Sequence, residues 1–264
     1  MSMQKIIFFD IDGTLCHHSK GVPGSAERSV KQLISSGHYA VLCTGRNKSI
    51  IKQEIIDLGF HGIIGGCGTY VEFNKKILHN AVLPESVGRH ALQILHNTKV
   101  NFFIESPDFV YLDDAEAGEN FQAAVSRVQK GYGQNLRPLS GSDFCFSKIT
   151  GYPKDDSDIA ALIRELKPHF QVIVHPEHNY IEIIPAGYSK ASGIELLLSH
   201  LGLSRNDSYA FGDSRNDLEM FDAVTYGIAM GNSPDEVKQR APYETLSLLD
   251  GGIEYGLKKF GLIR

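Results

Sequence analysis

Two aspartates, Asp10 and Asp12, stand one residue apart near the start of the sequence. They follow the apolar run Ile6–Phe9 and come just before Gly13 and Thr14, a turn signal. An apolar run of this length bounded by a turn is typical of a buried strand in a parallel sheet. Ligands bind outside the carboxyl ends of such strands, so we expect both carboxylates to face a crevice. Two carboxylates held this close repel each other, so a cation must lie beside them or one of them must hold a proton. Either arrangement indicates a site with a chemical role.

The spacing of Asp10 and Asp12 suits two carboxylates that act on one ligand. Residues two apart in an extended chain point to the same side, so both can reach the same group. One can act as a nucleophile, as in aspartyl-phosphate chemistry, and the other as a general acid and then a general base. The alternative is a pair of loop carboxylates that only cap a turn. The preceding strand and the following Gly-Thr favour the catalytic interpretation.

A second acidic cluster follows another expected strand, 208–211. It contains Asp213, Asn216 and Asp217. Carboxylate and amide oxygens are the hard ligands that Mg²⁺ prefers. Acidic and amide side chains near a helix start also stabilise that helix, and both roles can hold together. Beside the first pair of aspartates, the metal site is the favoured interpretation.

Two further features could hold a phosphate group. Thr44 and Gly45 follow the apolar run Tyr39–Cys43, and a hydroxyl with an open glycine amide at such a turn can bind phosphate oxygens. Lys190 stands at the start of an expected helix, where its charge and the helix dipole both attract an anion. Each signal is weak alone, because many turns contain Thr-Gly and most lysines are solvated. Together with the acidic clusters they suit phosphoryl transfer.

The expected elements place these residues at strand and helix ends. Apolar periodicity predicts core strands at 6–9, 39–43, 60–64, 208–211 and 226–230, and core helices at 26–34, 51–58, 194–201 and 218–221. Between these parts it predicts strands at 101–105, 109–112, 144–151, 171–175 and 180–184, and helices at 87–95, 121–128 and 159–166. The outer parts alternate strand and helix, which is typical of βαβ units around a parallel sheet, whereas the middle mixes strand pairs and helices.

The sequence therefore predicts an α/β fold. We expect a Rossmann-like parallel-sheet core with helices on both faces and an inserted α+β cap domain. The expected core comprises residues 1–83 and 180–264, and the expected cap comprises residues 84–179.

The bulk composition excludes several classes of protein. The 264 residues are 42% hydrophobic, enough for a full core in one large or two smaller domains. The net charge of -5 argues against a nucleic-acid partner. No apolar stretch approaches the roughly 20 residues of a membrane helix, and no signal peptide is visible. The four cysteines form no Cys-x-x-Cys pair, so we expect free thiols and a cytoplasmic location.

The motifs and their order resemble those of the haloacid dehalogenase-like superfamily. They are Asp-x-Asp-Gly-Thr from Asp10, Thr-Gly-Arg from Thr44, Lys190, and Gly-Asp-x-x-Asn-Asp from Gly212. Finer features resemble the Cof-type sugar-phosphatase subfamily, namely Ile181–Pro185 before Ser189-Lys190 and the run Ala229–Asn232. The expected insert matches that subfamily's cap, in which substrate specificity resides. The resemblance implies a magnesium-dependent phosphatase acting on small phosphate monoesters such as sugar phosphates.

The resemblance also implies roles for the acidic residues. Asp10 would attack phosphorus and form an aspartyl-phosphate. Asp12 would protonate the leaving alcohol and then activate water. Mg²⁺ would be held by the Asp10 carboxylate, the Asp12 backbone carbonyl and Asp213, with Asp217 supporting these ligands.

The transferring phosphoryl group would be held by a separate set of residues. By the same resemblance, these are the backbone amide of Ile11 together with Thr44, Gly45, Lys190 and Asn216. One position departs from the pattern, because Cof-type relatives commonly carry Asn-Gly-Ala where this chain has Cys67-Gly68-Thr69. A thiol lacks the paired donor and acceptor of an amide, so we assign no role to Cys67 and expect leaving-group recognition to differ.

Two alternatives to a phosphatase remain open at this point. A phosphomutase would use the same two aspartates but return the phosphate to a second hydroxyl. A non-catalytic phosphometabolite-binding protein would bind without turnover, although the presence of both Asp10 and Asp12 argues against it. We expect a small-molecule phosphate ester as the partner, without nucleic acid or membrane, and the sequence predicts no oligomeric state.

Overall fold

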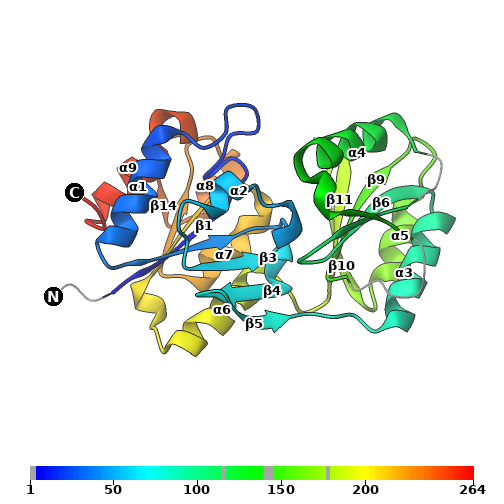
Figure 1. Ribbon diagram of the computed structural model, residues 1–264, viewed down its shortest axis with the longest axis horizontal. Coiled ribbons are helices and arrows are strands. Elements are labelled where there is room, and N and C mark those ends of the chain that lie inside the picture. Colours follow the sequence, from blue (N-terminus) through cyan, green and yellow to red (C-terminus); the bar gives the residue numbers. More distant parts are fainter. Residues whose placement is uncertain (1–3, 114–116, 140–145, 177–178) are drawn as a thin grey trace. The chain divides into compact units, whose positions relative to one another are not determined.

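The computed structural model describes residues 4–113, 117–139, 146–176 and 179–264 (Figure 1). The chain forms two compact units. We call the first the core, which comprises Met1–Gly45, Gln53–His79 and Ser189–Arg264. The second, which we call the cap, comprises Arg46–Lys52 and Asn80–Tyr188. None of the helices in the described ranges is long and apolar enough to cross a membrane.

The core is built on one eight-stranded sheet. Its strands are β1 (Ile6–Phe9), β2 (Tyr39–Cys43), β3 (Gly62–Gly65), β4 (Tyr70–Phe73), β5 (Lys76–Asn80), β12 (Ser208–Gly212), β13 (Tyr226–Ala229) and β14 (Tyr243–Glu244). The strand order is β14-β13-β12-β1-β2-β3-β4-β5. Pairing is parallel from β14 to β3 and antiparallel between β3 and β4. The central strand β1 thus lies between β12 and β2, so their carboxyl ends meet at one edge.

Helices pack against both faces of the core sheet, as the sequence predicts. They are α1 (Gly24–Ser35), α2 (Gln53–Ile56), α6 (Lys190–Leu201), α7 (Leu218–Ala223), α8 (Asp235–Arg240) and α9 (Gly252–Lys259). Figure 1 shows α1 and α9 side by side over one face and α6 below the other. Alternate residues along β1 are buried on opposite faces, and Ile6 and Phe8 pack with Leu197 of α6 and Phe221 of α7. Burial of these side chains is the main force that orders the sheet ends.

Several core elements differ from the sequence-based expectation. The helix predicted at 51–58 is only the four-residue α2, because the preceding segment Arg46–Lys52 packs with the cap and contains the 3₁₀ turn Lys48–Ile50. The strand β14 and the helices α8 and α9 were not expected from the sequence. The strands β4 and β5 were not expected either. They are joined at Asn74 and Lys75, which adopt positive φ angles of 49° and 65°. Asparagine tolerates this conformation, so it was the available signal for the turn.

The cap contains a six-stranded sheet in the order β10-β11-β9-β6-β7-β8. Its strands are β6 (Val100–Glu105), β7 (Val110–Leu112), β8 (Leu136–Pro138), β9 (Lys148–Pro153), β10 (Phe170–His175) and β11 (Tyr180–Pro185), and its helices are α3 (Glu85–Asn97), α4 (Glu119–Tyr132) and α5 (Ile159–Leu166). Helices α3 and α5 cover one face through a shared apolar cluster, represented by Leu95, Phe102, Ile149, Leu162 and Ile181. The start of the strand expected at 144–151 lies outside the described residues at 144 and 145.

The strand at the end of the cap shows where the second core segment begins. Residues from Tyr180 onward were expected in the core, but β11 pairs antiparallel with both β10 and β9 of the cap sheet. The compact cap accordingly extends to Tyr188. The chain thus returns to the core at Ser189, one residue before Lys190, which begins α6 and carries the expected phosphate-binding amine.

Candidate active site

Asp10 directly follows β1 and is held at the carboxyl edge of the core sheet. Its backbone N–H donates a hydrogen bond of 3.0 Å to the carbonyl of Phe211, on the neighbouring strand β12. Asp10 is only 5% exposed. The expected motif residues Thr44 and Asp213 follow β2 and β12, the two strands that flank β1. Three motifs from distant parts of the sequence therefore meet at one sheet edge, as predicted.

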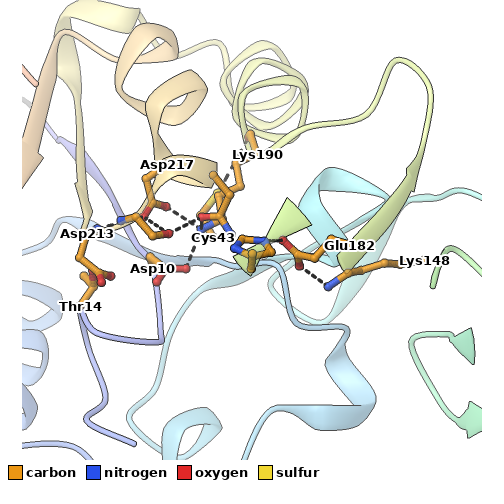
Figure 2. A network of polar contacts seen from close by, with 11 residues as sticks. Asp10, Thr14, Cys43, Lys148, Glu182, Lys190, Asp213 and Asp217 are labelled. Atoms are coloured by element: carbon orange, nitrogen blue, oxygen red, sulfur yellow. Dashed lines mark hydrogen bonds and ion pairs between the residues drawn. The ribbon is translucent and has the colours of Figure 1, made fainter. Parts of the chain in front are cut away.

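Lys190 is the first residue of α6 and is almost fully buried, at 1% exposure. The helix start is fixed by Ser189, whose side chain accepts a hydrogen bond from the Ser192 backbone N–H. The Nζ atom of Lys190 lies 2.6 Å from Oδ1 of Asp10 and 2.6 Å from Oδ1 of Asp217 (Figure 2). A buried amine between two carboxylates is not a solvated surface lysine, and it compensates charges that would otherwise be costly to bury.

The same contacts shift the protonation equilibria of the site. Burial raises the pKa of Asp10 well above its usual value, the charge of Lys190 opposes this, and the neighbouring acidic residues raise it further. Burial lowers the pKa of Lys190, but the carboxylates of Asp10 and Asp217 outweigh it and raise that pKa well above its ordinary range. Excess negative charge is thus concentrated here, which favours a bound cation.

Asp10, Asp213 and Asp217 form a cluster of acidic groups. One carboxylate oxygen of each lies within 4.8 Å of those of the others, close enough to hold one metal ion. Asp217 is fixed within the cluster, since its Oδ2 accepts hydrogen bonds of 2.9 Å from the backbone N–H groups of Asp213 and Ser214. Burial, followed by the charge of Asp217, raises the pKa of Asp213 to about 7. Three hard oxygen ligands and surplus negative charge fit a divalent cation.

Two residues that were not assigned a role hold this cluster in shape. The hydroxyl of Thr14 donates a hydrogen bond of 2.8 Å to Oδ1 of Asp213 (Figure 2). The side-chain amide of Asn232 donates one of 2.9 Å to the carbonyl of Gly13 and accepts one of 2.9 Å from the Leu248 N–H. Gly13 adopts φ +82°, and a Cβ there would come within 2.2 Å of Asp213. Thr14 and Asn232 both lie in motifs identified in the sequence, and their place in these motifs was the available signal of a role at the site.

The remaining expected residues occupy the loops around this edge. Asn216 accepts a hydrogen bond of 3.1 Å from Nζ of Lys190, so it joins the buried network directly. Ile11 is fully buried, whereas Asp12 is exposed. Thr44 is 1% exposed at the end of β2 and precedes the partly exposed Gly45. Asp12 is therefore the most accessible of the acidic residues at this edge.

Cys67 is also close to this edge, although it has no assigned role. It has an unusual φ of 55° for a side chain other than glycine, and its N–H donates to the Thr44 carbonyl at 3.1 Å. Cys43 is a buried free thiol, as expected, and Cys145 lies outside the described residues. Burial raises the pKa of Cys43 well above its usual value, so this thiol is chemically quiet.

The fold places acidic residues and a buried lysine together at the end of a central parallel strand. The chain belongs to the haloacid dehalogenase-like hydrolases, whose sequence pattern matches residues 7–257. This confirms the family expected from the order of the motifs.

Relatives extend the comparison over the whole chain. A Bacillus subtilis protein named "Putative phosphatase YkrA" is 31% identical, and the match covers 98% of this chain and 99% of that protein. The B. subtilis protein YitU, named 5-amino-6-(5-phospho-D-ribitylamino)uracil phosphatase, is 29% identical and 97% of each chain is covered. A hypothetical protein of Geobacillus kaustophilus HTA426 has a crystal structure with a TM-score of 0.86 at 29% identity, covering 99% of this chain and 100% of that one. The chain is therefore an enzyme of a hydrolase family whose named relatives are phosphatases.

Proposed function

We propose that the protein is a magnesium-dependent phosphatase of small phosphate monoesters, such as a sugar phosphate. The observation that carries this proposal is the buried contact of 2.6 Å between Lys190 and Asp10 beside two further carboxylates. A carboxylate at a strand end, a fixed cation beside it and acidic ligands for a metal are the parts that phosphoryl transfer requires. The phosphatase names of the relatives support the same chemistry.

Asp10 acts as the nucleophile in the proposed reaction. Its carboxylate oxygen attacks phosphorus, the bond from phosphorus to the leaving oxygen breaks, and an aspartyl-phosphate forms. Asp12 donates a proton to the leaving alcohol and then removes one from the water that hydrolyses the intermediate. The exposure of Asp12 suits this exchange with substrate and water.

The proposed metal ligands are Asp10, the backbone carbonyl of Asp12, Asp213 and Asp217. Mg²⁺ would neutralise the charge of the phosphoryl oxygens, which is its usual contribution to this chemistry. Of the carboxylates, Asp217 is already committed to Lys190 and to two backbone amides, so it mainly supports the other ligands. This division of roles agrees with the fit of the acidic cluster to a divalent cation.

The proposed phosphoryl-binding groups are the Ile11 backbone amide, Thr44, Gly45, Lys190 and Asn216. Lys190 would hold one phosphoryl oxygen as well as Asp10, and its near-complete burial keeps its charge unscreened by solvent. The net charge of -5 argues against a nucleic-acid partner. We infer a cytoplasmic location.

Release of inorganic phosphate tests this proposal. The wild type is assayed with p-nitrophenyl phosphate and a panel of sugar phosphates, first with Mg²⁺ and then with excess chelator. We expect release that requires the metal, and a loss of at least about 10³-fold in Asp10→Asn, which keeps the shape of the side chain. Turnover in Asp10→Asn would refute the nucleophile assignment. Transfer of phosphate to a second hydroxyl without release would identify a phosphomutase instead.

A further inference from the structure

A cavity of about 460 Å³ lies within the core, on the sheet face opposite α6. Three neighbouring strands form its floor, because Leu42 of β2 pairs with Ile63 of β3, and Ile63 pairs with Glu72 of β4. Val41 and Ile64 pack in the apolar cluster that includes α6. Their neighbours Leu42 and Ile63 therefore point to the other face, since side chains alternate along a strand. A cavity of this volume is large enough for a small metabolite.

This cavity is at the opposite end of the sheet from the acidic cluster. The segment 59–61 directly precedes β3 and lines the cavity, as does the turn of Asn74 and Lys75 between β4 and β5. Thr44 and Cys67, in contrast, come after the carboxyl ends of β2 and β3. Among the described residues, none that we assigned to phosphoryl transfer lines this cavity. It is therefore a second place in the core where a molecule can bind.

The lining of the cavity is largely apolar. Besides Leu42 and Ile63, it includes Ile56 of α2 and Phe60, both of which are half-buried. The ring of Phe60 packs edge-on against Phe9, with the ring centroids 5.9 Å apart, so its position is fixed. An apolar group placed here would remove its own surface and that of these side chains from water, which favours binding.

The cavity also has one acidic and one basic side chain. Glu72 is only 9% exposed, and its Oε2 accepts a hydrogen bond from the hydroxyl of Tyr70. Lys75 is exposed and makes no ion pair with another residue in the described ranges. Because it stands three residues after Glu72, their Cα atoms are within about 11 Å of each other. Burial lowers the pKa of His61, which also lines the cavity, so that its ring is mainly neutral at pH 7.

We propose that this cavity binds an apolar α-amino acid, such as phenylalanine, as its zwitterion. The carboxylate of Glu72 holds the ammonium group, the amine of Lys75 holds the carboxylate, and the apolar lining encloses the side chain. Hydrogen bonds between such charged groups are the strong ones, so each end of the ligand contributes to affinity. An amine without a carboxylate, or an acid without an amine, would satisfy only one of the two residues.

Calorimetric titration of the full chain at pH 7 tests this proposal with three probes. They are L-phenylalanine, 2-phenylethylamine, which lacks the carboxylate, and 3-phenylpropionate, which lacks the amine. We expect saturable binding of L-phenylalanine, with each of the other two about 10- to 100-fold weaker, the size expected for a hydrogen bond to a charged group. No saturation by L-phenylalanine up to about 10 mM, or equal affinity for either analogue, would overturn the proposal.

Two variants assign the two ends of the ligand. Glu72→Gln keeps an oxygen for the Tyr70 hydroxyl but loses the charge, so it should bind L-phenylalanine no more tightly than 3-phenylpropionate. Lys75→Met keeps an unbranched side chain without the amine, so L-phenylalanine should lose its advantage over 2-phenylethylamine. Affinities that both variants leave at the wild-type value would refute the assigned contacts. If Glu72→Gln does not fold, as its Tm would show, Lys75→Met and the three probes still decide.

The matched control is Lys76→Met. Lys76 is the next residue along the chain, is exposed and is not among the residues that line the cavity. It makes the same change of charge as Lys75→Met and should leave the affinity for L-phenylalanine intact. An equal loss of affinity in the two lysine variants would show a general effect of charge and would overturn the role of Lys75. The titration contains no phosphate ester, so its outcome is independent of the proposed phosphatase function.

Discussion

The Nζ atom of Lys190 lies 2.6 Å from Oδ1 of Asp10, and both side chains are buried at the carboxyl edge of the core sheet. The two residues are 180 positions apart in sequence. The pair therefore joins the first strand to a helix that begins only after the whole cap. The site is therefore complete only when the first strand and this helix pack together in the core.

Replacement of Lys190 by methionine should destabilise the protein and abolish turnover. The carboxylates of Asp10 and Asp217 would lose their buried counter-charge, which costs about 3–5 kcal/mol when one partner of a buried pair is removed. Urea unfolding in chelator measures this loss. Added Mg²⁺ should recover part of it, because the ion brings positive charge to the same carboxylates.

The control for this experiment is Lys31→Met on the exposed face of α1, where the pair with Glu27 is solvated. It should change the unfolding free energy by less than about 1 kcal/mol. Equal losses in the two lysine variants would show that the Lys190 contacts contribute no more than a surface pair.

Thr14 should set the metal affinity of the site through its hydrogen bond to Asp213. Thr14→Val keeps the shape and removes the donor, so Asp213 loses its fixed orientation. We expect the Mg²⁺ concentration for half-maximal activity to rise about 10-fold or more, as for other groups that orient metal ligands. Thr14→Ser keeps the hydroxyl and should stay near the wild type. A Mg²⁺ titration that is the same for the valine variant and the wild type would remove this role.

Asn232 should act on the catalytic step by positioning the loop that carries Asp12. Its amide holds the Gly13 carbonyl at 2.9 Å, one residue after the proposed acid. In Asn232→Ala we expect kcat for p-nitrophenyl phosphate to fall about 10-fold, the value of one hydrogen bond, with little change in KM. Asn232→Asp keeps an acceptor for Leu248 but no donor for Gly13, so it should lose kcat similarly. A rise in KM alone would assign Asn232 to substrate binding.

The gathering of the motif residues at the carboxyl edge of the core sheet could be predicted from the sequence because its signals are local. Each motif follows its own apolar strand, and parallel strands bring their carboxyl ends together whatever lies between them. Asp10, Thr44 and Asp213 were located in this way, whereas Lys190 was singled out by its place at the start of an expected helix. The helix predicted at 51–58 was wrong at its start, because Arg46–Lys52 packs with the cap. A periodic apolar pattern carries no information on such tertiary contacts.

The buried contact between Lys148 and Glu182 in the cap could not be predicted from the sequence, for a different physical reason. Lys148 and Glu182 are 34 residues apart, and they meet only through the order of strands in an antiparallel sheet. A single residue of register would move each side chain to the other face. Neither residue differs in type or spacing from an ordinary solvated charge, so nothing local distinguished it.

The pairing of Glu182 should make the stability of the cap depend on pH. Burial raises the pKa of Glu182, but the charge of Lys148 and hydrogen bonds from His175 and Lys148 outweigh it, so the pKa in the folded chain lies well below its usual value. A carboxyl with a pKa lowered by folding stabilises the protein above its unfolded pKa of about 4.3, and this contribution is lost as pH falls through the folded pKa. The advantage of the wild type over Glu182→Gln should therefore be largest near neutral pH.

Urea unfolding of the wild type and Glu182→Gln at several pH values between 7 and 3 measures this dependence. At neutral pH the variant leaves Lys148 buried without its carboxylate, so we expect a difference of about 3 kcal/mol. Below about pH 4 the difference in unfolding free energy between the wild type and the variant should narrow. At such a pH the unfolded wild-type chain binds a proton at Glu182 that the folded chain does not bind, and this favours the unfolded state. The exposed pair of Glu85 and Arg89 on α3 provides the matched control. The difference in unfolding free energy between the wild type and Glu85→Gln should stay constant with pH. A difference between the wild type and Glu182→Gln that is constant with pH would show that packing, and not charge, is the contribution of Glu182.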